Sequence, residues 1–194
     1  MRVVLATRNA GKLAEVVAIV GSAADVAGLE ALAGIELPPE DGDTYEENAL
    51  VKGLAVTRAA GVPALADDSG LEVDALGGAP GVRSSRYAGP ACDPVANKDK
   101  LLRELDGVPT RARGARFVCV AALVIPDGRE WFARGEVEGR IADGSRGTGG
   151  FGYDPLFIPA GYECTFAEMT SGEKNEISHR TLAFQAIKKL LEEI

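Results

Sequence analysis

The sequence predicts an α/β protein built on a mixed β-sheet with flanking helices. Short apolar runs alternate along the chain with segments whose apolar residues recur at helical spacing, a pattern typical of this class. The run Phe117–Ile125 is almost wholly apolar, which indicates a central strand buried on both faces. A polar turn at 126–129 and a roughly alternating run over Trp131–Ile141 then predict its hairpin partner.

The N-terminal segment is expected to form a strand followed by two helices. Val3–Ala6 indicates a buried strand, and the next helix carries four apolar residues on one face: Leu13, Val16, Val17 and Val20. Pro38–Asp43 is expected to be an acidic loop. Asp43, with Glu46 three positions later, matches a capping box, which would open a second helix running to about Ala60.

The rest of the chain continues the alternation. The pattern predicts short strands at Ala64–Ala66 and Leu156–Ile158 and a helix at Val95–Leu105. Glycine-rich loops are expected at Leu76–Pro90 and Gly144–Gly152. A last helix is expected from about Ser178. Its broad apolar face comprises Leu182, Ala183, Ala186, Ile187, Leu190, Leu191 and Ile194.

Composition limits the partners that the chain can take. With 21 basic and 29 acidic residues, its formal net charge is −8, so no nucleic acid partner is expected. No apolar run approaches the length of a membrane span, so no membrane partner is expected. The length of 1–194 suits a single domain, built as one globular unit or as two lobes that share one sheet. Cys92, Cys119 and Cys164 form no CxxC pair, and three scattered thiols are typical of a cytoplasmic protein.

The turn after the first strand is a candidate phosphate site. Backbone N–H groups and the dipole at a helix start favour a phosphate group. Thr7 and Asn9 add hydrogen-bonding side chains, and Lys12 adds a positive charge. The spacing is not that of a Walker A loop, and a helix cap formed by Asn9 explains the residues equally well.

Adjacent carboxylates form a second candidate site. Asp67 and Asp68 follow an apolar run, so they are expected at the carboxyl end of a strand, where α/β folds bind ligands. Neighbouring negative charges repel unless a cation relieves them, and Mg²⁺ prefers hard oxygen ligands. A metal site is therefore favoured over a solvated aspartate-rich turn.

Two segments in the C-terminal part carry further candidates. The glycines of 147–152 match GxGxxG, but no strand precedes them and Pro155 follows soon after, so a dinucleotide site is rejected. Phe151 and Tyr153 could stack on a base or fill the core equally well.

Lys174, His179 and Arg180 place hydrogen-bond donors near the start of the last helix. A lone histidine is more often structural, although the neighbouring arginine favours a binding role. Since no GxSxG elbow is present, a serine hydrolase triad is not supported.

Five motifs occur in order along the chain. They are Thr7-x-Asn9-x-x-Lys12, Ala66-Asp67-Asp68-Ser69-Gly70-Leu71, Gly77-Gly78-Ala79-Pro80-Gly81, Gly149-Gly150-Phe151-Gly152-Tyr153-Asp154-Pro155 and Ser178-His179-Arg180. With these motifs the chain resembles, over essentially its whole length, the inosine triphosphate pyrophosphatase family of XTP/dITP diphosphatases.

The resemblance implies an elongated α/β fold with a long mixed sheet and two lobes around a central nucleotide cleft. It implies hydrolysis of dITP, ITP and XTP to the monophosphate and pyrophosphate, with Mg²⁺ as cofactor. It also implies a cytoplasmic homodimer whose other partner is the small-molecule nucleotide substrate.

The resemblance further implies roles for individual residues. Asp68 would accept a proton and bind the metal together with Glu40, for which Asp41 and Asp43 are close alternatives. The remaining residues would bind the substrate: Thr7, Arg8, Asn9, Ala10, Gly11, Lys12, Ser69, Phe151, Gly152, Tyr153, Asp154, Lys174, His179 and Arg180.

Two chemical arguments agree with these roles. A triphosphate needs local positive charge in an acidic protein, which Mg²⁺, Lys12, Lys174 and Lys52 would supply. Donors from His179 and Arg180 would match the six-keto oxygen of hypoxanthine and xanthine and would oppose the amino group of adenine. The alternatives are a Maf-like pyrophosphatase for other nucleotides and a non-catalytic nucleotide-binding module.

Overall fold

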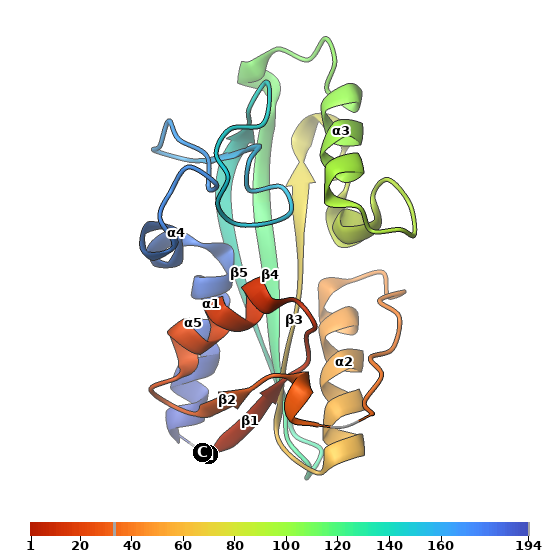
Figure 1. The fold of residues 1–194 in the computed structure, drawn as a ribbon, viewed down its shortest axis with the longest axis vertical. Coiled ribbons are helices and arrows are strands. Elements are labelled where there is room, and N and C mark those ends of the chain that lie inside the picture. The colour runs from red at the N-terminus through yellow and green to blue at the C-terminus, as the bar shows by residue number, and fades with distance from the viewer. Residues whose placement is uncertain (33, 194) are drawn as a thin grey trace. The chain divides into compact units, whose positions relative to one another are not determined.

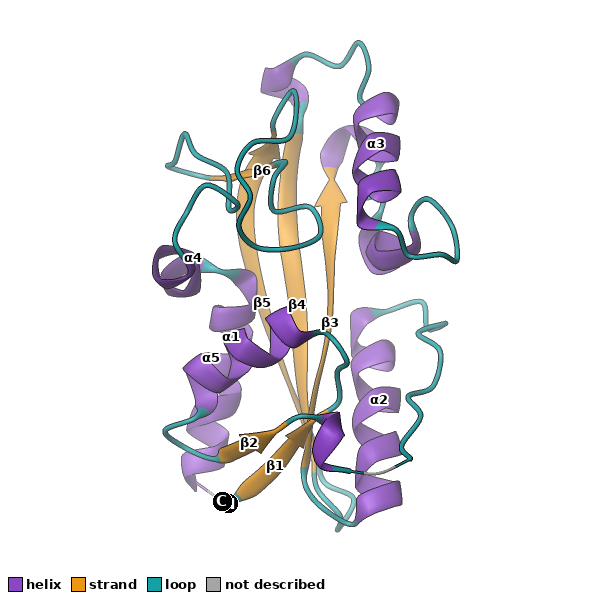
Figure 2. Ribbon diagram, viewed as in Figure 1, coloured by secondary structure: helices purple, strands orange, loops and turns teal. Residues whose placement is uncertain are grey.

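The fold is a mixed α/β arrangement, as the sequence predicts (Figures 1 and 2). The structure is a computed structural model that describes residues 1–32 and 34–193. Six strands form one sheet in the order β2-β1-β3-β4-β5-β6. The pairs β1–β2 and β1–β3 are parallel and β5–β6 is antiparallel, so the sheet is mixed.

The strands are β1 (Arg2–Leu5), β2 (Asp25–Ala27), β3 (Ala64–Val73), β4 (Gly114–Val124), β5 (Glu130–Ile141) and β6 (Phe157–Pro159). The helices are α1 (Ala10–Val20), α2 (Tyr45–Ala60), α3 (Pro94–Glu104), α4 (Ser171–Ile177) and α5 (His179–Glu193). Short 3₁₀ turns occur at Leu29–Ala31, Asp74–Leu76, Gly81–Arg86 and Thr110–Ala112.

The chain divides into two compact units. Unit 1 comprises Met1–Asp68, Cys119–Gly135 and His179–Ile194, and unit 2 comprises Ser69–Val118 and Glu136–Ser178. Three of the four divisions fall within β3, β4 and β5, and the fourth falls between α4 and α5. Each unit contains its own hydrophobic core.

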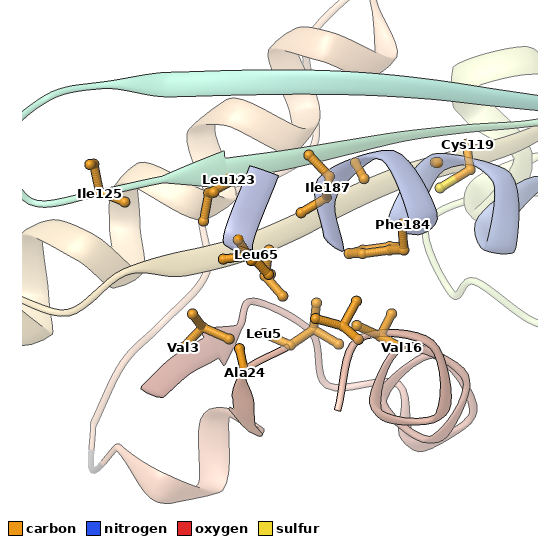
Figure 3. Close-up of a cluster of buried hydrophobic side chains, with 14 residues drawn as sticks. Val3, Leu5, Val16, Ala24, Leu65, Cys119, Leu123, Ile125, Phe184 and Ile187 are labelled. Atoms are coloured by element: carbon orange, nitrogen blue, oxygen red, sulfur yellow. The ribbon is translucent and has the colours of Figure 1, made fainter. Parts of the chain in front are cut away.

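Unit 1 has two cores, one on each side of its strands. Successive side chains of a strand point to opposite faces, so Val3 and Leu5 enter one core and Val4 enters the other. The first core packs against α1 and α5 and is drawn in Figure 3; it includes Val16, Leu65, Cys119, Leu123, Phe184 and Ile187. The second packs against α2 and includes Ala6, Ala49, Val56, Ala64, Ala66 and Ala122.

Unit 2 is built around a cluster of three phenylalanine rings. Phe117 of β4 meets Phe157 of β6 edge-on, with ring centroids 4.7 Å apart, and stacks on Phe166 at 5.9 Å. Leu101 of α3 and the neighbouring Leu105 are fully buried in the same core. This core supports the loop that carries the 149–155 motif, because Tyr153 belongs to it.

The structure corrects the expected end of the third strand. Strand β3 continues through Asp67 and Asp68 to Val73, so the acidic pair lies inside a strand rather than after it. The sequence predicts a strand that ends at Ala66, but Leu71 and Val73 are fully buried and belong to the same strand.

Other element boundaries also differ from the expectation. The capping box of α2 is formed by Thr44 and Glu47, one residue later than Asp43 and Glu46, because Thr44 accepts the hydrogen bond from the Glu47 N–H. Strand β2 and helix α4, both short, were not expected. Among the described residues, no helix has the length and apolarity needed to cross a membrane.

Two of the expected apolar faces are narrower than the pattern indicated. Val17 of α1 and Leu182 of α5 are 41% and 44% exposed, whereas their neighbours Val16 and Ala183 are fully buried. Ile194, expected on the same face of the last helix, lies outside the described residues.

Candidate functional site

The two carboxylates of β3 lie on opposite sides of the strand. Leu65 belongs to the core beneath α1 and α5, while Ala66 belongs to the core beneath α2. The alternation continues into the polar residues, so Asp67 faces α1 and α5 and Asp68 faces α2. Both residues are buried, with 1% and 5% of their surface exposed.

Asp67 is surrounded by cations. Its Oδ2 accepts a hydrogen bond from Lys12 Nζ of α1 at 2.8 Å and lies 3.5 Å from Arg180 Nε of α5. Cys119 Sγ of β4 lies 3.9 Å from the same oxygen. Burial disfavours the ionised form, but Lys12, Arg180 and Lys52 outweigh it and hold the pKa of Asp67 well below its usual value. Asp67 is therefore a fixed anion that holds Lys12 and Arg180.

Arg180 is fixed from two sides. Its guanidinium is 1% exposed, pairs with Glu15 of α1 through Nη1, and faces Asp67 through Nε. Burial works against the charge, but Asp67 and Glu15 raise the pKa of Arg180 above its usual value. His179, the first residue of α5, is also buried.

The start of α5 lies unusually close to β5. A Cβ added at Gly135 would come within 2.2 Å of the His179 carbonyl oxygen and 2.6 Å of the Ala183 nitrogen. Only glycine therefore lets the first turn of α5, which presents His179 and Arg180, approach the strand this closely.

On the other side of β3, helix α2 supplies the partners of Asp68. Asn48 Nδ2 donates a hydrogen bond to Asp68 Oδ2 at 2.9 Å. Lys52, one helical turn later, donates to Glu40 Oε1 and, at 2.6 Å, to the backbone oxygen of Asp67. Burial lowers the pKa of Lys52, but Asp67, Glu40 and Asp68 reverse this and raise it.

Asp68 titrates in the opposite direction from its neighbour. Burial raises the pKa of Asp68, and the charge of Glu40 adds to this rise, while Lys52 and the Asn48 hydrogen bond oppose it. The net effect is a pKa above that of an ordinary aspartate. When two neighbouring carboxyl groups are driven apart in this way, the one with the raised pKa is suited to accept a proton. That group is Asp68.

The β1–α1 turn forms the helix cap that the sequence allowed. Asn9 Oδ1 accepts hydrogen bonds from the N–H groups of Gly11 and Lys12 at 2.9 and 3.1 Å, and Thr7 Oγ1 accepts from the Asn9 N–H. Exposed Arg8 approaches the Ile35 carbonyl oxygen at 3.5 Å. The cap and the Lys12–Asp67 contact together fix this turn beside the carboxylate.

The other candidate residues lie in unit 2. Lys174 of α4 is buried and pairs with Asp154 at 2.7 Å, and its ammonium lies 4.7 Å from the centre of the Phe151 ring. The ring of Tyr153 lies in the core and its hydroxyl donates to the Ser84 carbonyl oxygen, whereas Phe151 is half-buried. Ser69, also half-buried, follows Asp68 in β3.

The three acidic residues in the loop 38–43 before α2 differ in exposure and contacts. Glu40 contacts Lys52 and is near enough to Asp68 to raise its pKa, while the side chains of Asp41 and Asp43 are exposed. Within residues 1–32 and 34–193, no three acidic, histidine or cysteine side chains gather as a ready-made metal cage. A metal at this position would therefore rely on one or two carboxylates.

Two residues of the site were missed in the sequence. Asn48 and Glu15 contact Asp68 and Arg180, respectively. Asn48 precedes Lys52 by four positions, so two polar residues interrupt the buried face of one helix, and this signal is visible in the sequence. Glu15 carries no comparable signal, because its partner lies 165 positions away.

Fold and site together define a mixed α/β protein in which buried carboxylates are paired with lysine and arginine. The sequence model of the Ham1 family matches residues 3–190, and the chain belongs to the Ham1 family. A protein of Streptomyces coelicolor named dITP/XTP pyrophosphatase is 47% identical to it, over 100% of this chain and 98% of the relative. One of Elusimicrobium minutum with the same name is 49% identical, over 97% and 98%.

Solved structures agree with the fold. The Staphylococcus aureus Ham1 protein matches with a TM-score of 0.88 at 39% identity, covering 100% of this chain and 99% of that one. A HAM1 protein from Coxiella burnetii matches with a TM-score of 0.90 at 38% identity and full coverage of both chains.

Proposed function

We propose that this chain is a nucleoside triphosphate pyrophosphatase that converts dITP, ITP and XTP to the monophosphate and pyrophosphate. The observation that carries this proposal is the pair of neighbouring buried carboxylates in β3, of which Asp67 is bound by Lys12 and Asp68 by Asn48, with Lys52 alongside. The names of the relatives support the same reaction. Its biological result would be the removal of deaminated purines from the nucleotide pool.

In this reaction water attacks the α-phosphorus and forms a new P–O bond. The bond between the α-phosphorus and the oxygen that bridges to the β-phosphorus breaks, and pyrophosphate leaves with that oxygen. Asp68 accepts the proton of the attacking water, since its carboxylate is buried and its orientation is set by the Asn48 amide. Lys12 and Lys52 place positive charge where the phosphoryl oxygens become more negative.

We propose Mg²⁺ as the cofactor, held by Glu40 and Asp68. The donor set fits, because Mg²⁺ is commonly bound by one or two carboxylates plus substrate phosphates. The charges fit as well, because four carboxylates, Glu15, Glu40, Asp67 and Asp68, lie close to the three cations Lys12, Lys52 and Arg180. When bound, the ion would polarise the phosphoryl oxygens and offset their charge.

The substrate contacts extend the same proposal. The turn Thr7–Lys12, with Arg8, would meet the phosphates, and His179 and Arg180 would meet the six-keto oxygen of the base. Arg180 is held by Glu15 and Asp67, so its orientation is set before substrate arrives. Ser69, the 151–154 segment and Lys174 would supply the remaining contacts to the nucleotide.

We further propose that the enzyme is a cytoplasmic homodimer. Three free cysteines, one of them exposed, are in keeping with a reducing compartment. Light scattering of the purified chain tests the dimer directly, and a mass of one chain of 20.2 kDa would refute it.

One assay tests the central proposal. Pyrophosphate release is measured with dITP, ITP, XTP, dTTP and UTP, each with and without Mg²⁺. Turnover of the three purine nucleotides only, and only with Mg²⁺, is expected. Preference for dTTP or UTP would favour a Maf-like enzyme, and ITP binding without pyrophosphate release would favour a non-catalytic module. In Asp68→Asn, kcat should fall by about 100-fold or more, the scale of general-base catalysis.

A further inference from the structure

Asn48 connects the catalytic strand to the loop that carries Glu40. Its side chain is fully buried in α2, and its Nδ2 donates to Asp68 Oδ2 at 2.9 Å. Its Oδ1 accepts a hydrogen bond from the Gly42 N–H at 2.9 Å, while Nδ2 also lies 3.4 Å from the Gly42 carbonyl oxygen. One amide group therefore contacts both β3 and the acidic loop.

The loop determines which end of the amide faces Asp68. The Gly42 N–H is a donor and requires an acceptor, so Oδ1 of Asn48 must point to the loop. The NH₂ group is then directed to the Asp68 carboxylate, which can only accept when ionised. Because a buried amide needs its partners, this orientation is strongly preferred over the flipped one.

Gly42 makes this contact possible. A Cβ at position 42 would lie 2.8 Å from Asn48 Oδ1 and 2.9 Å from the Cβ of Glu47. Any larger residue would push the loop away from Asn48, or push Asn48 towards β3. The next residue of the loop is fixed as well, since Glu47 Oε2 accepts a hydrogen bond from the Asp43 N–H at 2.9 Å.

Lys52 completes the attachment of the loop to α2. It follows Asn48 by one helical turn and reaches Glu40 as well as the backbone of Asp67. Lys52 thus holds the carboxylate of the loop, while Asn48 holds its backbone and the Asp68 carboxylate. The separation between Glu40 and Asp68 is set by these two side chains of a single rigid helix.

We propose that Asn48 is a positioning residue for the reaction: its amide fixes the rotation of the Asp68 carboxylate and the place of the Glu40 loop relative to it. This inference rests on the proposed function, in which Asp68 activates the attacking water. A misplacement of about 1 Å at such a group can reduce turnover by about 100-fold. Asn48 acts on Asp68 and does not itself need to touch the substrate.

Asn48→Asp is the sharpest test. The replacement keeps an acceptor for the Gly42 N–H but puts a carboxylate oxygen where the donor to Asp68 was. With dITP as substrate, kcat is expected to fall by about 10- to 100-fold while KM changes by less than about 3-fold. Adding Asp68→Asn to this variant restores a donor–acceptor pair, so the melting temperature should recover although activity does not.

Two further variants separate positioning from stability. Gly42→Ala presses on the same amide from the loop side and should lower kcat by about 10-fold although neither Asn48 nor Asp68 is replaced. Thr57→Val is the control, because Thr57 is another buried polar residue of α2, and its Oγ1 donates to the Val124 carbonyl oxygen at 3.3 Å. It should lower the melting temperature and leave kcat unchanged.

The outcomes are distinct. If Asn48→Asp and Gly42→Ala lose stability as Thr57→Val does but keep wild-type kcat, Asn48 is only structural and the inference is wrong. If Asn48→Asp does not fold, Gly42→Ala decides by its kcat. A wild-type protein that releases no pyrophosphate from any of the five nucleotides would instead refute the proposed function, and the positioning role with it.

Discussion

Replacing Asp67 with asparagine tests the contrast between the two carboxylates of β3. The variant keeps the shape of the side chain but removes the negative charge between Lys12 and Arg180. Asp67 is 1% exposed, so these cations lose a partner that water does not readily replace. We expect a clear loss of stability at neutral pH.

The magnitude follows from the burial. Removing one partner of a buried ion pair costs about 3–5 kcal/mol. In a chain of 150–250 residues, each kcal/mol lowers the melting temperature by about 2–4 °C. The Asp67→Asn protein should therefore melt about 6–20 °C below the wild type at pH 7, measured by circular dichroism.

The same variant has a predictable pH dependence. Lys12, Arg180 and Lys52 lower the pKa of Asp67 in the folded state below its ordinary value of 3.8. The stabilisation is therefore complete above about pH 3.8 and is lost as the pH falls below it towards the folded-state pKa. The gap between wild-type and variant melting temperatures should narrow in acid, if both proteins are followed from pH 7 to pH 3.

Asp127→Asn is the matched control. Asp127 pairs with Arg129 in the β4–β5 turn, where both side chains are more than half exposed, so its replacement should leave the melting temperature almost unchanged. An Asp67→Asn protein that melts within about 2 °C of the wild type, like this control, would refute the assignment of Asp67 as a fixed structural anion.

Further predictions concern the same site and unit 2. Asp68→Asn should melt at or above the wild-type temperature at pH 7, because a raised pKa favours folding only at low pH and that contribution is lost as the pH rises. Lys174→Met should destabilise by about 3–5 kcal/mol in urea unfolding, and adding Asp154→Asn should recover part of the loss. Gly135→Ala should cost about 1–3 kcal/mol and reduce dITP turnover by displacing the first turn of α5, whereas Gly144→Ala, which meets no neighbour, should change neither. Treatment with EDTA should abolish pyrophosphate release, and added Mg²⁺ should restore it; full activity in EDTA would exclude the proposed cofactor.

Much of the fold followed from the sequence because apolar spacing reports burial directly. The hairpin of β4 and β5, the helix α3 and the final helix were expected within one or two residues, except that β4 begins at Gly114, three residues before the predicted start. Short elements were missed, since three residues in β2 and seven residues in α4 carry too little periodicity. The true end of β3 was missed because two aspartates and a glycine imitate a turn.

The site was predictable in its residue types but not in its geometry. Asp67 and Asp68 were predicted as neighbouring candidate residues, and both are buried, yet their sequence context could not reveal that they face different helices. The ion pair of Arg180 with Glu15 joins opposite ends of the chain, and no local pattern encodes such a contact. In the sequence analysis Arg180 is a hydrogen-bond donor to the base, a role that concerns turnover and not stability. Burial between two carboxylates now predicts that Arg180→Ala loses both.

Because side chains alternate between the two faces of β3, the number of residues that precede Asp67 in the strand determines which face it occupies. Asp67 and Asp68 have the same chemistry and differ in role solely because one lies at an odd and the other at an even position of the strand. Inserting or deleting a single residue between Ala64 and Asp67 would exchange the faces they occupy, so that Asp68 would face Arg180 and Asp67 would face Asn48. Insertions and deletions are therefore tolerable in the turn before Ala64, but within the strand only if they change its length by an even number of residues. This requirement limits which changes of length can accumulate as the family diverges.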